Sequence, residues 1–137
     1  MSDIVLARET KPIPFSLTIE YAHLCEEVGW ERRNYVEFHE ALEGSLLVVT
    51  ARSQAGALVG AARLTGDVFA ATLFDVVVHP DHQRCGVGKS MLTYIMGFCR
   101  AAGIKRIYCL ADNPESSAYW AHQGWLKIDG YQYAFTI

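Results

Sequence analysis

The segment from Asp75 to Ser90, DVVVHPDHQRCGVGKS, limits the possible folds more than any other part of the chain. An apolar run enters a polar loop with two glycines, and the loop leads into an amphipathic helix expected over 86–102. Gly86 and Gly88 lack a Cβ atom, so the backbone can turn tightly and direct its N–H groups at a ligand. The first N–H groups of a helix have no partner inside it and lie at its positive end. This turn is therefore predicted to bind an anion such as a phosphate or diphosphate.

Three phosphate-binding patterns can be compared with this loop. A Walker A loop requires a glycine five residues before Gly88, where this chain has Gln83. The dinucleotide fingerprint requires a third glycine three residues after the second, where this chain has Met91. The pattern Q/R-x-x-G-x-G/A is matched in full by residues 83–88, and Arg84 and Lys89 would add positive charge.

Periodicity in the rest of the chain predicts one mixed α/β domain over residues 1–137. Helices are expected over 18–28 and 34–42, followed by strands over 45–52, 57–65 and 68–79. After the helix over 86–102, a strand is expected over 104–111, a helix over 113–124, and two closing strands over 125–128 and 131–137. The first three strands would form an antiparallel meander. The strand, helix and strand that follow would form a right-handed crossover with a parallel pair.

Composition argues against several classes of protein. The 137 residues carry a formal net charge of −3, which gives no basic surface for nucleic acid or an anionic membrane. No apolar run approaches the roughly 18 residues that span a bilayer, and the first residues do not resemble a secretory signal, so a cytoplasmic location is expected. The four cysteines have no zinc-site spacing, so free thiols and no metal are expected at Cys25, Cys85, Cys99 and Cys109.

Taken together, these features resemble the GNAT superfamily of N-acetyltransferases. The resemblance covers essentially the whole chain, and its motifs are Gly29-Trp30, Gly60…Arg63…Gly66-Asp67, the strand end Asp75–Pro80, the glycine loop, and Gly124-Trp125, where the family usually has Gly-Phe. It implies a GNAT-like fold in which the two central parallel strands splay apart. It also implies acetyl-CoA as the acyl donor, bound in the resulting cleft.

The resemblance further implies which residues bind the donor. Main-chain groups of Val76, Val77 and Val78 would hold the pantetheine arm. The diphosphate would be surrounded by a longer set of residues, namely Gln83, Arg84, Cys85, Gly86, Val87, Gly88, Lys89 and Ser90. Asn113 and Trp120 would also contact the cofactor.

Acetyl transfer by direct attack of a primary amine in a ternary complex requires a proton acceptor for the amine and an acid for the leaving thiolate. Many relatives carry this acid as a tyrosine at the position of Trp120, and an indole does not titrate usefully. Either the adjacent Tyr119 acts as the acid or the thiolate leaves unassisted. Where some relatives carry a catalytic glutamate this chain has Thr72, which leaves Asp75 as the candidate base. Asp75 could equally be a buried carboxylate bonded to Arg63.

The acceptor is expected to be a small-molecule or peptide amine. Trp30 is a candidate for its pocket, and Arg32 and Arg33 either recognise an acidic acceptor or form an exposed charged turn. The alternative function is an acetyl-CoA-binding regulatory module with little or no turnover. The protein is expected to be a monomer or a homodimer.

Overall fold

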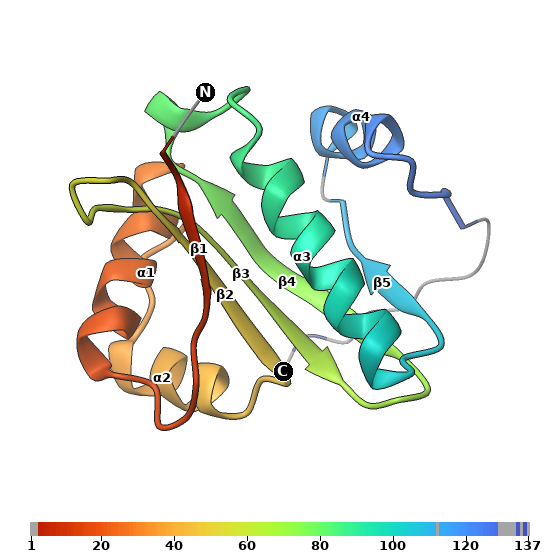
Figure 1. Ribbon diagram of the computed structural model, residues 1–137, viewed down its shortest axis with the longest axis horizontal. Helices are drawn as coiled ribbons and strands as arrows, with labels where there is room; N and C mark the ends of the chain where they lie inside the picture. The colour runs from red at the N-terminus through yellow and green to blue at the C-terminus, as the bar shows by residue number, and fades with distance from the viewer. Residues whose placement is uncertain (1–2, 112, 129–133, 135, 137) are drawn as a thin grey trace.

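A five-stranded sheet runs through the molecule between helices (Figure 1). The computed structural model describes residues 3–111, 113–128, 134 and 136. The strands lie side by side in the order in which the chain forms them, β1 (Val5–Arg8), β2 (Leu47–Arg52), β3 (Leu58–Gly66), β4 (Ala71–Val78) and β5 (Ile107–Cys109). The pairs from β1 to β4 are antiparallel, and β4 pairs with β5 in parallel. The predicted mixed sheet is therefore confirmed.

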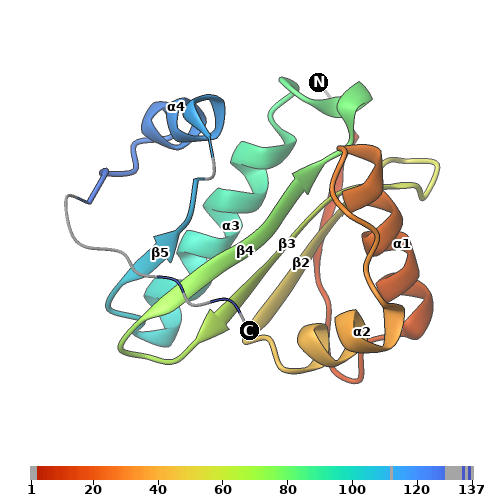
Figure 2. The ribbon, with the colours of Figure 1, turned by 180° about the vertical axis from the view of Figure 1, so that it is seen from behind.

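Helices cover both faces of this sheet. Helices α1 (Phe15–Glu27) and α2 (Tyr35–Glu43) lie on one face, as Figure 2 shows, and α3 (Val87–Ala102) crosses the other face. A single 3-10 turn (Pro80–His82) connects β4 to the loop before α3, and α4 (Pro114–His122) follows β5. The arrangement has three layers, with the carboxyl end of β4 and the start of α3 close together at one edge.

Each face of the sheet has its own hydrophobic core. Side chains alternate between the faces along a strand, so Val48 and Val49 of β2 lie in different cores. On the α3 side, Val49 packs with Met91 and Ile95, which are fully buried. On the side of α1 and α2, Val48 packs with the buried ring of Tyr21. These two cores fix α1 and α3 against opposite faces of β4.

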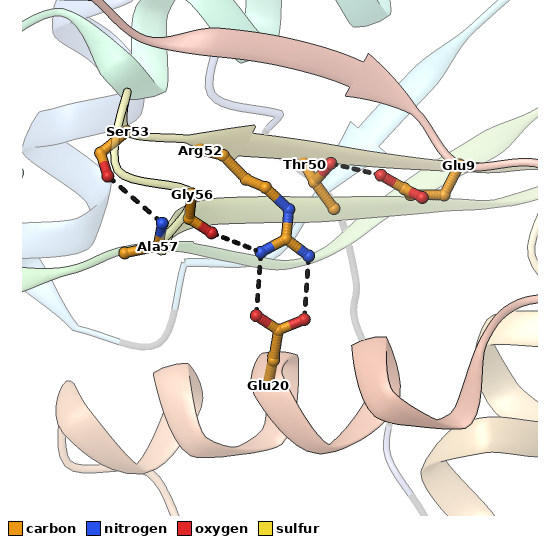
Figure 3. A network of polar contacts seen from close by, with 7 residues as sticks. All are labelled: Glu9, Glu20, Thr50, Arg52, Ser53, Gly56 and Ala57. Carbon is orange, nitrogen blue, oxygen red and sulfur yellow. Dashed lines mark hydrogen bonds and ion pairs between the residues drawn. The ribbon is translucent and has the colours of Figure 1, made fainter.

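The bounds of the helices agree with the capping signals of the sequence. The side chain of Asn34 accepts a hydrogen bond from the N–H of Glu37 at 3.0 Å, which starts α2 where the sequence predicts it. Gly103 ends α3 with a φ of +73°, a conformation that favours glycine. Arg52 of β2 forms a two-pronged ion pair with Glu20 of α1, with N···O distances of 2.8 and 2.9 Å (Figure 3). This ion pair joins α1 to the sheet on the side away from β5.

The structure differs from the predicted elements at β1, at residues 125–128 and at β5. The first third of the chain was predicted to be helical, but it also contains β1, an edge strand of four residues that is too short to show a periodic pattern. Residues 125–128 are not a strand, and the side chains of Leu126 and Ile128 are 91% and 62% exposed. The other closing strand, predicted over 131–137, lies outside the described residues except at 134 and 136. β5 spans three residues instead of the eight predicted over 104–111.

Two irregularities in β4 shape the site. Ala61 pairs with Val77 and Arg63 pairs with Phe74, so two residues of β4 oppose one residue of β3 and form a β-bulge. Pairing with β5 ends at Leu73, although β4 continues to Val78. The second half of β4 therefore has no strand partner on its β5 side in the described part of the chain. The predicted splaying of the parallel strands is confirmed.

Candidate functional site

The loop before α3 presents a row of free backbone N–H groups. Arg84 has a φ of +63° and Gly86 a φ of +85°, and alternation of such left-handed residues turns successive N–H groups toward a common point. Among the described residues, no acceptor lies within hydrogen-bonding distance of the N–H groups of residues 84–89. The first N–H bonded inside the helix belongs to Ser90 and donates to the carbonyl of Gly86 at 2.9 Å. This geometry is that of an anion cradle, and we use that name for residues 84–89.

Contacts with the end of β4 hold the anion cradle in place. The side-chain amide of Gln83 donates to the carbonyl of Val78 at 3.0 Å, and the N–H of His79 donates to the carbonyl of Val59 at 2.8 Å. Gln83, predicted as a direct cofactor contact, therefore anchors the loop to the strand. This anchoring sets the orientation of the N–H groups before any ligand binds.

The space around the cradle fits a diphosphate group. A Cβ atom built on Gly86 would meet no atom within 4 Å, so the backbone there is open to a ligand. Arg84, Cys85, Lys89 and Ser90 are exposed, whereas the side chain of Val87 is buried in the core and offers only its N–H. Exposed Arg and Lys side chains add cationic groups beside the N–H donors. The residues present therefore match the chemistry of the diphosphate of coenzyme A.

The open seam beside β4 lies next to the cradle. The N–H of His79 donates to Val59 on β3, and main-chain groups alternate in direction along a strand, so those of Val77 also face β3 while those of Val76 and Val78 face the β5 side. The carbonyl of Val78 is already used by Gln83, whereas the main-chain groups of Val76 and the N–H of Val78 have no strand partner in the described part of the chain. Val76 and Val78 pack toward the α3 core and Val77 toward the core of α1 and α2. Main-chain groups of Val76 and the N–H of Val78 are thus available to an extended ligand arm, as the resemblance implies for these two residues, whereas Val77 pairs with Ala61 of β3.

Tyr119, and not Trp120, lies over the cradle. A Cβ atom on Gly88 would lie 2.7 Å from the Tyr119 hydroxyl oxygen, so this hydroxyl contacts the first turn of α3. Trp120 turns toward the α3 core and packs on Trp125 with ring centroids 4.9 Å apart. Burial raises the pKa of Tyr119, so the phenol is protonated at neutral pH. The structure therefore places a proton donor beside the cradle, one residue before the position usual in relatives.

A cavity of about 600 Å³ lies beside α4. Asn113, one of the residues that line it, caps α4 by accepting a hydrogen bond from the N–H of Ser116 at 2.8 Å. This bond leaves the amide nitrogen of Asn113 available to a ligand. The other lining residues are Ala111, Pro114, Ser117, Ala118, Ala121 and Lys127.

Asp75 lies on the opposite side of the sheet from the α3 core. Its two carboxylate oxygens each accept from an arginine at 2.7 Å, Oδ1 from Arg33 and Oδ2 from Arg63. Burial alone would raise the pKa of Asp75, but the hydrogen bonds and charges of these arginines outweigh it and leave the pKa below its usual value. An ionised carboxylate that is bonded on both oxygens is poorly suited to accept a proton from an amine. The contacts of Asp75 share no residue with those of Tyr119, the other predicted catalytic residue.

A second cavity, of about 370 Å³, lies beside Asp75. We call it the arginine pocket because Arg32, Arg33 and Arg63 line it, together with Asn34, Glu37, Phe38 and Ala41. The guanidinium of Arg33 stacks over Phe38 at 4.8 Å and lies 5.8 Å from the ring centroid of Trp30. Arg32 and Arg33 thus line a cavity and do not form a simple exposed turn. The contact of Arg33 with Asp75 spans 42 positions of the sequence, and no local pattern indicates it.

Three further features concern the described residues only. In this part of the chain, no three His, Cys, Asp or Glu side chains are grouped closely enough to hold a metal ion. None of the helices in the same ranges has the length and apolar character needed to cross a membrane. Cys25, Cys85, Cys99 and Cys109 are free thiols.

Comparison with known proteins identifies the family. A sequence model of the acetyltransferase (GNAT) family matches residues 16–125, which is most of the chain. An uncharacterized N-acetyltransferase of Prochlorococcus marinus is 38% identical over 122 residues, covering 85% of this chain and 67% of the relative. A second, from Pyropia yezoensis, is 35% identical over 112 residues, covering 79% of this chain and 64% of the relative. The chain belongs to the GNAT acetyltransferase family, and it spans about two thirds of the length of these relatives.

Solved structures show the same fold. A GNAT family acetyltransferase from Streptococcus pneumoniae superposes with a TM-score of 0.73 at 23% identity, covering 96% of this chain and 98% of that one. An aminoglycoside acetyltransferase from an uncultured soil metagenomic sample superposes with a TM-score of 0.78 at 13% identity, covering 98% and 99%. The predicted GNAT-like fold is therefore confirmed. The curated relatives also include a GCN5-related N-acetyltransferase of Arabidopsis thaliana that is named as chloroplastic, 33% identical over 110 residues. The cytoplasmic location thus stays a prediction.

Proposed function

We propose that this protein transfers the acetyl group of acetyl-CoA to a primary amine of a small molecule or peptide, by direct attack in a ternary complex. The observation that carries the proposal is the anion cradle of free N–H groups at residues 84–89, next to the open seam of β4. Membership of the GNAT family supports the same reaction class.

Residues of the two sides of the seam would hold the donor. The N–H groups of the cradle would bind the diphosphate, with the charges of Arg84 and Lys89 beside them. Main-chain groups of Val76 and Val78 would hold the pantetheine arm, and Asn113 would contact it from the start of α4. When bound, acetyl-CoA supplies the acetyl group as an activated thioester.

The chain's own residues would then assist the transfer. The protonated phenol of Tyr119 would donate its proton to the departing sulfur. Free N–H groups on the unpaired side of β4 would donate to the acetyl oxygen as it gains negative charge. An alkylamine is neutral in only about one molecule in a thousand at pH 7. Because both oxygens of Asp75 are already hydrogen-bonded, the proton of the amine would be lost to water. The amine acceptor would bind in the arginine pocket, on the other side of β4 from α3.

The test is thiol release from acetyl-CoA with a panel of amines, peptides and polyamines at several pH values. Tyr119→Phe should lower kcat by about a hundredfold, the low end of the range for general acid catalysis, with an unchanged KM for acetyl-CoA. Tyr94→Phe is the matched control, because Tyr94 is a similarly exposed tyrosine, 39% against 38%, on the outer side of α3. No turnover of any amine by the wild-type protein would contradict the proposal.

The alternative is a regulatory module that binds acetyl-CoA with little or no turnover. The observation behind it is Trp120 at the position of the usual tyrosine, with its indole packed on Trp125. In that case acetyl-CoA would raise the Tm without releasing thiol, and Trp120→Tyr would create activity. Under the main proposal Trp120→Tyr lowers the Tm by loosening the contact with Trp125 and gives no gain in kcat.

A further inference from the structure

Asp75 connects three segments that are far apart in the sequence. Its carboxylate binds Arg33, which lies between α1 and α2, and Arg63, which lies on β3. Its carbonyl accepts a hydrogen bond at 2.6 Å from the hydroxyl of Tyr21, a fully buried residue of α1. Only 10% of the Asp75 side chain is exposed. All three side chains that bond to Asp75 therefore lie on the face of the sheet that carries α1 and α2.

The backbone of Asp75 makes the bulge of β4. Its φ of +53° lies in the left-handed region, which residues with a side chain rarely adopt, although aspartate is among the more tolerant. Together with Val76 it opposes a single residue of β3. A residue held in this conformation requires contacts that fix it, and the hydrogen bonds from Tyr21, Arg33 and Arg63 supply them. The same bulge sets the direction of the main-chain groups of Val76 and Val78, which face the open seam.

Arg33 connects the bulge to the arginine pocket. Its guanidinium lies against the ring of Phe38 and above Trp30, and it lines the pocket with Arg32 and Arg63. Movement of the segment 28–34 would therefore move both the pocket wall and the partner of Asp75. One carboxylate thus binds two arginines that line the proposed acceptor pocket, and its residue forms the bulge of the strand proposed to hold the acetyl group.

We infer that Asp75 is a positioning residue. Through Arg33, it holds the wall of the arginine pocket in a fixed position relative to the β4 bulge. This inference rests on the proposed function for its kinetic consequence, but the coupling of the two segments is a property of the fold itself. Asp75 acts through Arg33 and Arg63 and does not accept a proton in the reaction. The role is distinct from the candidate base expected from the sequence, because both oxygens are already bonded.

Breaking the ion pair between Arg33 and Asp75 tests the inference. Arg33→Met keeps Arg63 on Asp75 and should raise the KM for the amine about tenfold, with the KM for acetyl-CoA and kcat changed less than about twofold. Arg33→Lys keeps the charge and should restore part of the loss. The matched control is Arg52→Met, which breaks the ion pair with Glu20 between α1 and β2 (Figure 3). Neither of these two residues lines the arginine pocket. A purely structural role would give both methionine variants the same KM for the amine, and that result would overturn the inference.

Amide hydrogen exchange gives a readout that does not need turnover. Arg33→Met should speed exchange in the segment 28–34 and also at Val77, whose N–H faces β3 next to the bulge, whereas Arg52→Met should leave both places unchanged. Faster exchange at 28–34 with no change at Val77 would overturn the coupling. If the wild-type protein releases no thiol from acetyl-CoA but the exchange result holds, the proposed function fails and the positioning role of Asp75 is supported. If thiol is released and both variants match wild type, the inference fails and the function stands.

Discussion

Replacing Gly86 with alanine separates the conformational role of the anion cradle from its role in binding. Gly86 has a φ of +85°, and a Cβ atom at this position would meet no protein atom within 4 Å. The folded variant is therefore destabilised only by backbone strain, about 1–2 kcal/mol for an alanine in the left-handed region. For a chain of this length that free energy corresponds to a decrease in Tm of roughly 3–8 °C.

The same methyl group would affect ligand binding more strongly. It would project into the open space that we assign to the diphosphate, and it would displace at least one hydrogen bond from an N–H group to a charged oxygen. Such a bond contributes about 1.5–3 kcal/mol, which corresponds to a roughly 10- to 150-fold weaker Kd. The matched control is Gly56→Ala, because Gly56 has a φ of +90°, an equally open Cβ position, and a place in the turn between β2 and β3.

Calorimetric titration with acetyl-CoA, together with thermal unfolding without ligand, measures the two effects separately. Both variants should lose about the same Tm, and only Gly86→Ala should bind acetyl-CoA more weakly. Equal affinities for acetyl-CoA in the two variants would refute the assignment of the cradle, whatever their stabilities.

Two further predictions concern the thiols and the carboxylate of Asp75. Cys85 is exposed in the cradle, whereas burial raises the pKa of Cys25 to about 12 and of Cys109 to about 11 and Cys99 is buried. A thiol reagent at pH 8 should therefore modify Cys85 first, and acetyl-CoA should slow this reaction. Mass spectrometry of the labelled peptide measures the rate, and equal rates with and without acetyl-CoA would contradict the assignment of the site. The lowered pKa of Asp75 stabilises the fold above the ordinary aspartate pKa of about 3.9, and this contribution is lost as the pH falls further. The Tm of wild type should thus exceed that of Asp75→Asn at pH 7, with a gap that narrows below about pH 4; a gap independent of pH would show that the carboxylate is not the cause.

Local signals in the sequence were sufficient for most of the fold. The side-chain cap of Asn34 and the left-handed Gly103 act within one turn of their helices, so the sequence places these helix ends well. β1 was missed because its stability comes from pairing with β2, whose partner residues lie 41 (Arg8 to Val49) to 47 (Val5 to Arg52) positions further along the chain, and not from a pattern of its own. The splayed strands followed from the family resemblance, since no local feature of β4 marks where pairing with β5 ends.

The candidate site divides in the same way. The cradle is one contiguous segment whose glycines and helix start carry the geometry, so residues 84–89 could be predicted from the chain. The partners of Asp75 could not, because Arg33 and Tyr21 reach it only after α1 packs on the sheet. Tyr119 was named as an alternative to Trp120, and which of the two side chains faces the cradle depends on how α4 rotates when Trp120 packs on Trp125.

The direct test of the central claim is to follow the backbone amide signals of the protein by NMR during titration with acetyl-CoA. The N–H groups of residues 84–89 should show the largest shifts and the greatest gain in protection from solvent exchange, because they exchange water for the charged oxygens of the ligand. The amide signals of Gly86 and Gly88 report on this region directly. If acetyl-CoA binds while these signals stay in place and others move, the cradle is not the donor site and the proposed mechanism is wrong.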